Sequence, residues 1–171
     1  MKSYVELVNF AAPGGRCDIT PVFASALGFR CLIDDLLAPF EGASIQTVAG
    51  IDALGFILGT AAALRLGAGF VPVRKAGKLP DRCDRRRFVD YTGQDKGLEL
   101  GLGAVAPGSR VLVVDDWIET GAQMRAAIAL IEGQGGVVVG VCAFNIDDKD
   151  RTHGLLERYA CHSILRNCAA P

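Results

Sequence analysis

The stretch from Arg110 to Gln134, RVLVVDDWIETGAQMRAAIALIEGQ, constrains the fold more than any other part of the chain. It begins with four apolar residues, 111–114, a run typical of a strand buried on both faces of a parallel sheet. Asp115 and Asp116 follow this run, and a short loop then leads into 122–132, whose apolar spacing predicts a helix packed on the sheet. Such a loop lies at the carboxyl end of a parallel strand, where open α/β sheets bind their ligands.

The same loop is a candidate site for a phosphorylated sugar. Backbone amides at a helix N-terminus bind anions, so residues 119–123 predict a phosphate site. The two carboxylates just before the loop are suited to accept hydrogen bonds from ribose hydroxyls. A simpler interpretation stays open, in which Asp115 and Asp116 only end a strand and Gly121 eases a turn.

The rest of the chain predicts an α/β fold with an open parallel sheet flanked by helices. Two expected strands are joined by a helix that Gly67 ends, and this βαβ unit requires a parallel pair. In order, we expect a helix at 21–40, a strand at 45–49, a helix at 56–66, strands at 70–73, 111–114 and 137–144, a helix at 155–159 and a last strand at 162–165.

Length and composition fit one domain, 1–171, with a single core. The formal net charge of −1 favours neither acidic nor basic partners. No apolar run reaches the roughly 20 residues that span a bilayer, and the first ten residues lack a signal-peptide core. We therefore expect a cytoplasmic protein with no membrane partner. The six cysteines include no C-x-x-C pair, so no structural metal site is expected.

Positive charge is concentrated between Arg74 and Arg87, where seven of fourteen residues are basic. The segment could be a solvated hairpin, a nucleic-acid surface or a lid over a polyanionic small molecule. A lid beside a phosphate loop has a reason to be basic, whereas a nucleic-acid surface would add aromatic platforms, and only Phe88 and Tyr91 follow. We therefore expect a flap at about 78–101 and no nucleic-acid partner.

Several motifs resemble, in order and spacing, those of type I phosphoribosyltransferases, and among them the adenine phosphoribosyltransferases. They are Asp18-Ile19-Thr20-Pro21, Gly55-Phe56 with its preceding turn, GFVPVRKAGKLP at 69–80, and the run of apolar residues, two acids and a Thr-Gly turn at 111–121. The resemblance implies a small hood, at about 1–25, and a mobile flap. It also implies an enzyme, usually a homodimer, that transfers ribose 5-phosphate from phosphoribosyl pyrophosphate (PRPP) to a purine-type base. Pyrophosphate would be released, with Mg²⁺ held mainly by PRPP rather than by protein ligands.

The resemblance further implies which residues bind PRPP. Asp115 and Asp116 would hold the ribose hydroxyls and stabilise positive charge on the sugar during transfer. The basic residues Arg74, Lys75 and Lys78 would meet the pyrophosphate. The 5-phosphate would be surrounded by Glu119, Thr120, Gly121, Ala122 and Gln123.

Near the base, the resemblance implies Trp117, Ile118 and Arg16, with Trp117 either stacking on the base or packing under the loop. Glu119 is similar to an acid of hypoxanthine-guanine phosphoribosyltransferases that faces the base and can exchange a proton with a ring nitrogen. It could instead be an exposed residue that the helix dipole favours.

The sequence departs from the family near the base. Leu54 stands where an arginine is expected, and Arg16-Cys17 stands where an aromatic and a basic residue are expected. The flap has the sequence DYTG at 90–93 in place of Glu-Tyr-Gly. These departures motivate an alternative hypothesis, a catalytically inactive regulatory protein that senses PRPP.

Overall fold

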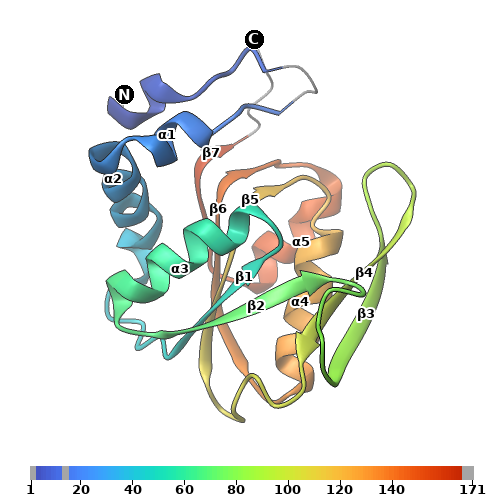
Figure 1. The fold of residues 1–171 in the computed structure, drawn as a ribbon. Helices are drawn as coiled ribbons and strands as arrows, with labels where there is room; N and C mark the ends of the chain where they lie inside the picture. Colours follow the sequence, from blue (N-terminus) through green and yellow to red (C-terminus); the bar gives the residue numbers. More distant parts are fainter. Residues whose placement is uncertain (1–2, 13–15, 167–171) are drawn as a thin grey trace.

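The computed structural model of the protein describes residues 3–12 and 16–166. The strands are β1 (Thr47–Ile51), β2 (Gly69–Lys75), β3 (Cys83–Val89), β4 (Asp95–Gly101), β5 (Arg110–Ile118), β6 (Val137–Ile146) and β7 (Cys161–Arg166). The helices are α1 (Thr20–Ala24), α2 (Ala26–Leu37), α3 (Leu54–Leu66), α4 (Ala122–Gly133) and α5 (Asp150–Arg158), with short 3₁₀ helices η1 (Ser3–Leu7) and η2 (Ala38–Phe40). Within the described residues, the strands form one seven-stranded sheet in the order β3-β4-β2-β1-β5-β6-β7 (Figure 1).

The sheet is parallel from β2 to β7, with β1, β5 and β6 between them. This confirms the predicted open parallel sheet and its βαβ unit. At the β2 edge the pattern changes, because β4 pairs antiparallel with β2 and β3 pairs antiparallel with β4. The β3–β4 hairpin occupies most of the predicted flap.

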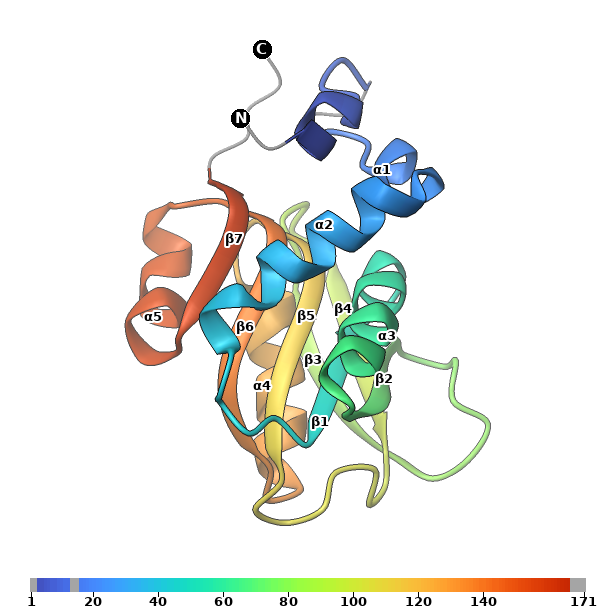
Figure 2. The same cartoon turned by 90° about the vertical axis from the view of Figure 1, so that its left-hand side faces the viewer.

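Helices α2 and α3 cover one face of the sheet, and α4 and α5 cover the other (Figures 1 and 2). Alternate residues of β5 divide the core between these faces, as the period of a strand requires. Leu112 and Val114 pack with the α2 and α3 layer, whereas Val111 and Val113 pack with the α4 layer. All four are fully buried, so the apolar run at 111–114 was correctly predicted to be covered on both faces.

The prediction of one continuous helix at 21–40 is wrong, because the structure has two helices, α1 and α2, in this range. Ser25 has an extended backbone and divides it into α1 and α2. The Ser25 hydroxyl accepts a hydrogen bond from the N–H of Gly28 at 3.1 Å, so this residue caps the start of α2. The helix predicted at 155–159 also begins earlier, at Asp150, where the side chain of Thr152 accepts the N–H of Lys149.

The N-terminal segment, which the sequence analysis assigns to a hood, lies above the sheet, beyond the end of β7 (Figure 1). Tyr4 is buried and donates its hydroxyl proton to Asp35 of α2 at 2.7 Å. Asn9 and Asp18 form an isolated antiparallel bridge that closes the segment on itself. Residues 1–2 and 13–15 of the predicted hood are outside the described residues.

Glycines bring the first turn of α3 against the central strands. A Cβ atom on Gly50 would lie 2.4 Å from the carbonyl oxygen of Gly55, and one on Gly55 would lie 2.8 Å from that of Val114. Both distances are too short for any side chain. The turn between β1 and α3 therefore sits directly beside the end of β5, which places both loops at one edge of the sheet.

Because this contact is between backbones, it cannot relax by a change of rotamer. We expect Gly50→Ala to lower the free energy of unfolding by about 1–3 kcal/mol, the usual cost of overpacking. Gly133→Ala is the control, since no atom lies within 4 Å of its added Cβ, and it should be neutral or slightly stabilising at the end of a helix. Urea unfolding of both variants measures the difference, and equal midpoints would contradict the tight contact.

Candidate active site

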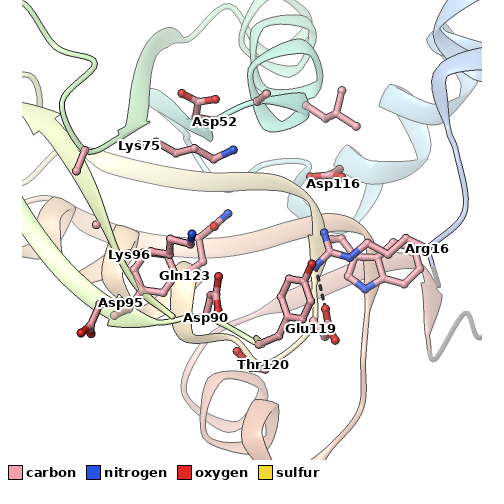
Figure 3. Close-up of a pocket in the computed structure, with 17 residues that line it drawn as sticks. Arg16, Asp52, Lys75, Asp90, Asp95, Lys96, Asp116, Glu119, Thr120 and Gln123 are labelled. Carbon is pink, nitrogen blue, oxygen red and sulfur yellow. Dashed lines mark hydrogen bonds and ion pairs between the residues drawn. The ribbon is translucent and has the colours of Figure 1, made fainter. Parts of the chain in front are cut away.

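A cavity of about 680 Å³ opens at the carboxyl edge of β1, β2 and β5, bounded on one side by the β3–β4 hairpin and on another by the hood (Figure 3). Its wall combines carboxylates, cations and aromatic rings. The lining residues are Arg16, Asp52, Ala53, Leu54, Lys75, Ala76, Phe88, Asp90, Tyr91, Asp95, Lys96, Gly97, Asp116, Trp117, Glu119, Thr120 and Gln123.

The two carboxylates at the end of β5 have different environments. Asp116 lines the cavity, whereas Asp115 lies behind the wall with only 2% of its surface exposed. Both oxygens of Asp115 accept hydrogen bonds, Oδ1 from the N–H of Asp116 at 2.9 Å and Oδ2 from Nε2 of Gln123 at 3.0 Å. Asp115 therefore fixes the strand end that presents Asp116 and ties it to the first turn of α4.

Burial raises the pKa of Asp115 well above its ordinary value, and the neighbouring Asp116 adds to the rise. The N–H of Asp116 and the amide of Gln123 act in the opposite direction, but they do not reverse it. The folded protein thus binds a proton at this site more tightly than the unfolded chain does.

The predicted phosphate loop, 119–123, leads from β5 into α4. Gly121 has a φ of 71°, a left-handed conformation that favours glycine, and it precedes the first helical residue, Ala122. Arg125 stabilises the loop, because its guanidinium donates a hydrogen bond to the carbonyl of Thr120 at 3.1 Å and another to the carbonyl of Arg151 at 2.9 Å. The loop is held in shape by these contacts, and Thr120 and Gln123 face the cavity.

Arg16 joins three separate segments at the mouth of the cavity. Its guanidinium forms an ion pair with Glu119 at 2.8 Å (Figure 3). It also lies over the rings of Tyr91, 5.0 Å from the centroid, and Trp117, 5.7 Å from the centroid. These are cation–π distances, so the hood, the hairpin turn and the end of β5 meet at one side chain.

Of the three basic residues predicted to meet pyrophosphate, only Lys75 lines the cavity, where it extends beside Asp52 (Figure 3). Arg74 points elsewhere and donates to the carbonyl of Lys78 at 3.0 Å. Its Nε lies 3.8 Å from the carboxylate of Asp52. Neither Arg74 nor Lys78 lines the cavity, and Lys78 is exposed.

The structure brings most of the other predicted residues together, with one clear exception. Ile118 is buried in the core on the α4 side, since it follows Trp117 on the strand and so points to the opposite face. Gly121 and Ala122 contribute backbone to the loop without lining the cavity. Sequence analysis did not single out Asp52 or Lys96. Asp52 could have been found as the carboxylate in the turn before Gly55-Phe56. The position of Lys96 beside the cavity depends on the pairing of β3 with β4, which sets it opposite Phe88.

Comparison with known families decides what this cavity belongs to. A family model of the phosphoribosyl transferase domain matches residues 30–169. The chain belongs to the phosphoribosyltransferase family. A relative from Dinoroseobacter shibae, named adenine phosphoribosyltransferase, is 49% identical over 133 residues that cover 78% of this chain and 73% of the relative. The adenine phosphoribosyltransferase of Maricaulis maris is 48% identical over 149 residues, 86% and 84% of the two chains.

Solved structures agree with this assignment to the phosphoribosyltransferases. The adenine phosphoribosyltransferase of Rhodothermus marinus superposes with a TM-score of 0.83 at 36% identity, over 96% of this chain and 97% of that one. The Saccharomyces cerevisiae enzyme, complexed with an imino-altritol bisphosphate and adenine, gives 0.80 at 30% identity, over 96% and 100%. The predicted fold class and the predicted purine-type phosphoribosyltransferase activity are confirmed, and these relatives do not support the inactive alternative.

The raised pKa of Asp115 makes stability depend on pH. A carboxyl group with a raised folded-state pKa stabilises the fold fully below its unfolded-state pKa, about 3.9 for Asp, and loses this contribution as pH rises through the folded-state value. Asp115→Asn removes the titration, so its free energy of unfolding relative to wild type should increase from pH 4 to pH 7.5. Urea unfolding at both pH values measures this trend. A difference that is constant, or that shrinks as pH rises, would contradict the stated environment of Asp115.

Proposed function

We propose that this phosphoribosyltransferase uses adenine as its acceptor base, transferring ribose 5-phosphate from PRPP and releasing pyrophosphate. The observation that carries the proposal is one cavity that combines Asp116, the loop at 119–123 and Lys75. PRPP carries sugar hydroxyls, a phosphate and a pyrophosphate. Binding it requires these three kinds of group within the length of one molecule. The relatives named adenine phosphoribosyltransferase support adenine as the purine.

In the proposed complex, the carboxylate of Asp116 accepts hydrogen bonds from the ribose hydroxyls, with Asp115 holding it in place. The amides at the start of α4 bind the 5-phosphate, where the helix dipole also favours negative charge. Lys75 meets the pyrophosphate as a point charge. The Nε2 of Gln123 already donates a hydrogen bond to Asp115. The Gln123 side chain must therefore break this hydrogen bond if it is to reach the phosphate.

Mg²⁺ fits this cavity as a companion of PRPP. The ion is usually bound by one or two carboxylates together with substrate phosphates, and Asp52 and Asp116 both line the wall. Among the described residues, no group of three or more His, Cys, Asp and Glu side chains could hold a metal ion by itself. When bound, Mg²⁺ would neutralise charge on the departing pyrophosphate.

The proposed reaction is displacement at the anomeric carbon of the ribose. The base nitrogen attacks as pyrophosphate leaves, and the carboxylate of Asp116 stabilises the positive charge that develops on the sugar. Glu119, at the corner with Arg16 and Trp117, is placed to accept a proton from the ring of the base. The flap at 78–101 would close over the site and exclude the water that otherwise hydrolyses PRPP.

We also propose that the protein is a homodimer. The outer surface of α2 and α3 carries two large apolar side chains, Leu27 and Leu64, which are 68% and 80% exposed. A hollow of about 230 Å³ lies between α2 and α3 and is lined by Phe29, Ile33 and Ala61 among others. A second copy packed here would cover this apolar surface, and analytical ultracentrifugation tests it, since a monomer at micromolar concentration would contradict the proposal.

The remaining assignments stay predictions from the sequence. They are a cytoplasmic location, a single domain at 1–171, and the absence of nucleic-acid and membrane partners. The structure adds one finding, that no helix among the described residues is long and apolar enough to cross a membrane.

A panel of bases tests the proposed function directly. Adenine, hypoxanthine, guanine and uracil are each incubated with the protein, PRPP and Mg²⁺, and pyrophosphate release is measured. We expect release with adenine and formation of its nucleotide. Release with a 6-oxopurine alone would move the acceptor assignment to that base. Binding of PRPP without release for any base would contradict the proposed transfer.

Glu119→Gln should lower turnover by ~10²-fold, because the amide cannot accept a proton. Affinity for PRPP should remain, since the backbone amides of the loop are untouched, and one limb of the pH–rate profile should flatten. Glu157→Gln makes the same chemical change on the exposed surface of α5 and serves as the control. Nearly equal turnover in the two variants would show that Glu119 does not act on the base.

A further inference from the structure

The turn after β2 is built around a buried carboxylate. Glu99, on β4, has no exposed surface. Its Oε1 accepts the N–H of Gly77 at 2.7 Å. Its Oε2 accepts the N–H of Lys78 at 3.3 Å and that of Leu79 at 3.2 Å. Arg85 of β3 completes the environment with an ion pair from Nε to Oε1 at 2.7 Å.

Successive backbone N–H groups that converge on one point form an anion site, and here the anion is a side chain of the protein. Hydrogen bonds to an ionised acceptor are roughly twice as strong as those between neutral groups. The backbone hydrogen bond from Gly77 is the largest cause of the lowered pKa of Glu99. The ionised carboxylate therefore holds the turn at 77–79 in one conformation.

This turn directly follows the part of β2 that faces the active site. Lys75 and Ala76 line the cavity, and the next three residues are the ones whose amides Glu99 binds. Lys75 pairs with Leu98, and this is the last residue pair between β2 and β4. Leu98 is the neighbour of Glu99 on β4. The strand pairing and the buried carboxylate thus fix the backbone on both sides of Ala76.

We propose that Glu99 is a positioning residue for pyrophosphate, because the turn it fixes at 77–79 sets the direction of Lys75 into the cavity. The inference rests on the proposed function, which places pyrophosphate at Lys75. Glu99 and Arg85 are paired residues of the β3–β4 hairpin, so the carboxylate also joins this turn to the flap. A residue needed only for stability would change the free energy of unfolding and leave the preference between ligands unaltered.

Calorimetric titration of the full chain with magnesium pyrophosphate and, separately, with ribose 5-phosphate tests the proposal. Glu99→Gln keeps the size of the side chain but replaces one acceptor oxygen with an NH₂ group. We expect pyrophosphate affinity to fall roughly tenfold, because at least one backbone N–H of the turn loses its acceptor and the turn is no longer held in one conformation. Affinity for ribose 5-phosphate should not change, since its phosphate is assigned to the loop at 119–123.

Arg85→Gln is the matched control. It removes the ion pair and leaves the three amide hydrogen bonds of Glu99 in place. The Arg85 side chain is 66% exposed, and without it Glu99 still accepts the three backbone hydrogen bonds that fix the turn, so pyrophosphate affinity should stay near that of wild type. An equal loss in both variants would assign the effect to the ion pair and overturn the role of the turn.

The titrations distinguish a wrong role for Glu99 from a wrong proposed function. A folded Glu99→Gln protein that loses both ligands equally, or neither, would overturn the inference. A wild-type protein that binds no pyrophosphate would overturn the proposed function and the inference with it. If the variant does not fold, amide hydrogen exchange of the wild type decides, because slow exchange at 77–79 supports the fixed turn and fast exchange overturns it.

Discussion

The burial of Asp115 is the interaction on which the rest of the active site depends. A carboxylate with almost no exposed surface, next to a second carboxylate, is costly unless the protein supplies hydrogen bonds. Here the N–H of Asp116 and the amide of Gln123 supply them. These bonds direct Asp116 into the cavity and connect the end of β5 to α4. The strand end and the loop at 119–123 consequently form one unit.

On the opposite wall of the cavity, Glu99 has a role similar to that of Asp115. It too is a buried carboxylate that accepts hydrogen bonds from neighbouring backbone, and it organises the turn beyond Lys75. The two walls of the cavity are thus held by buried carboxyl groups, and the sheet fixes the distance between them. By contrast, the third side is closed by contacts of Arg16 with Tyr91 and Trp117. These are contacts between side chains of separate segments, not hydrogen bonds of the sheet.

The features predicted correctly from the sequence are those that depend on residues close together in the chain. The apolar run at 111–114, the acid pair after it and the helix that Gly67 ends each carry their own pattern, and the structure has them in place. The break at Ser25 was missed because helical spacing continues across it. Ile118 was misplaced because a motif gives proximity in sequence, whereas strand alternation decides which face a side chain occupies. The ion pair of Arg16 with Glu119 joins residues 103 apart, and no local pattern predicts it.

The central claim is that the end of β5 is the ribose site of a PRPP-binding cavity, and titration calorimetry with PRPP and Mg²⁺ tests it most directly. Wild type should bind, and Asp116→Asn should bind roughly tenfold more weakly or worse, as expected when a hydrogen bond to a charged group is lost. Circular dichroism should show that the variant remains folded, since Asp116 lies at the cavity wall. Equal affinity in the two proteins, or no binding by wild type, would contradict the account.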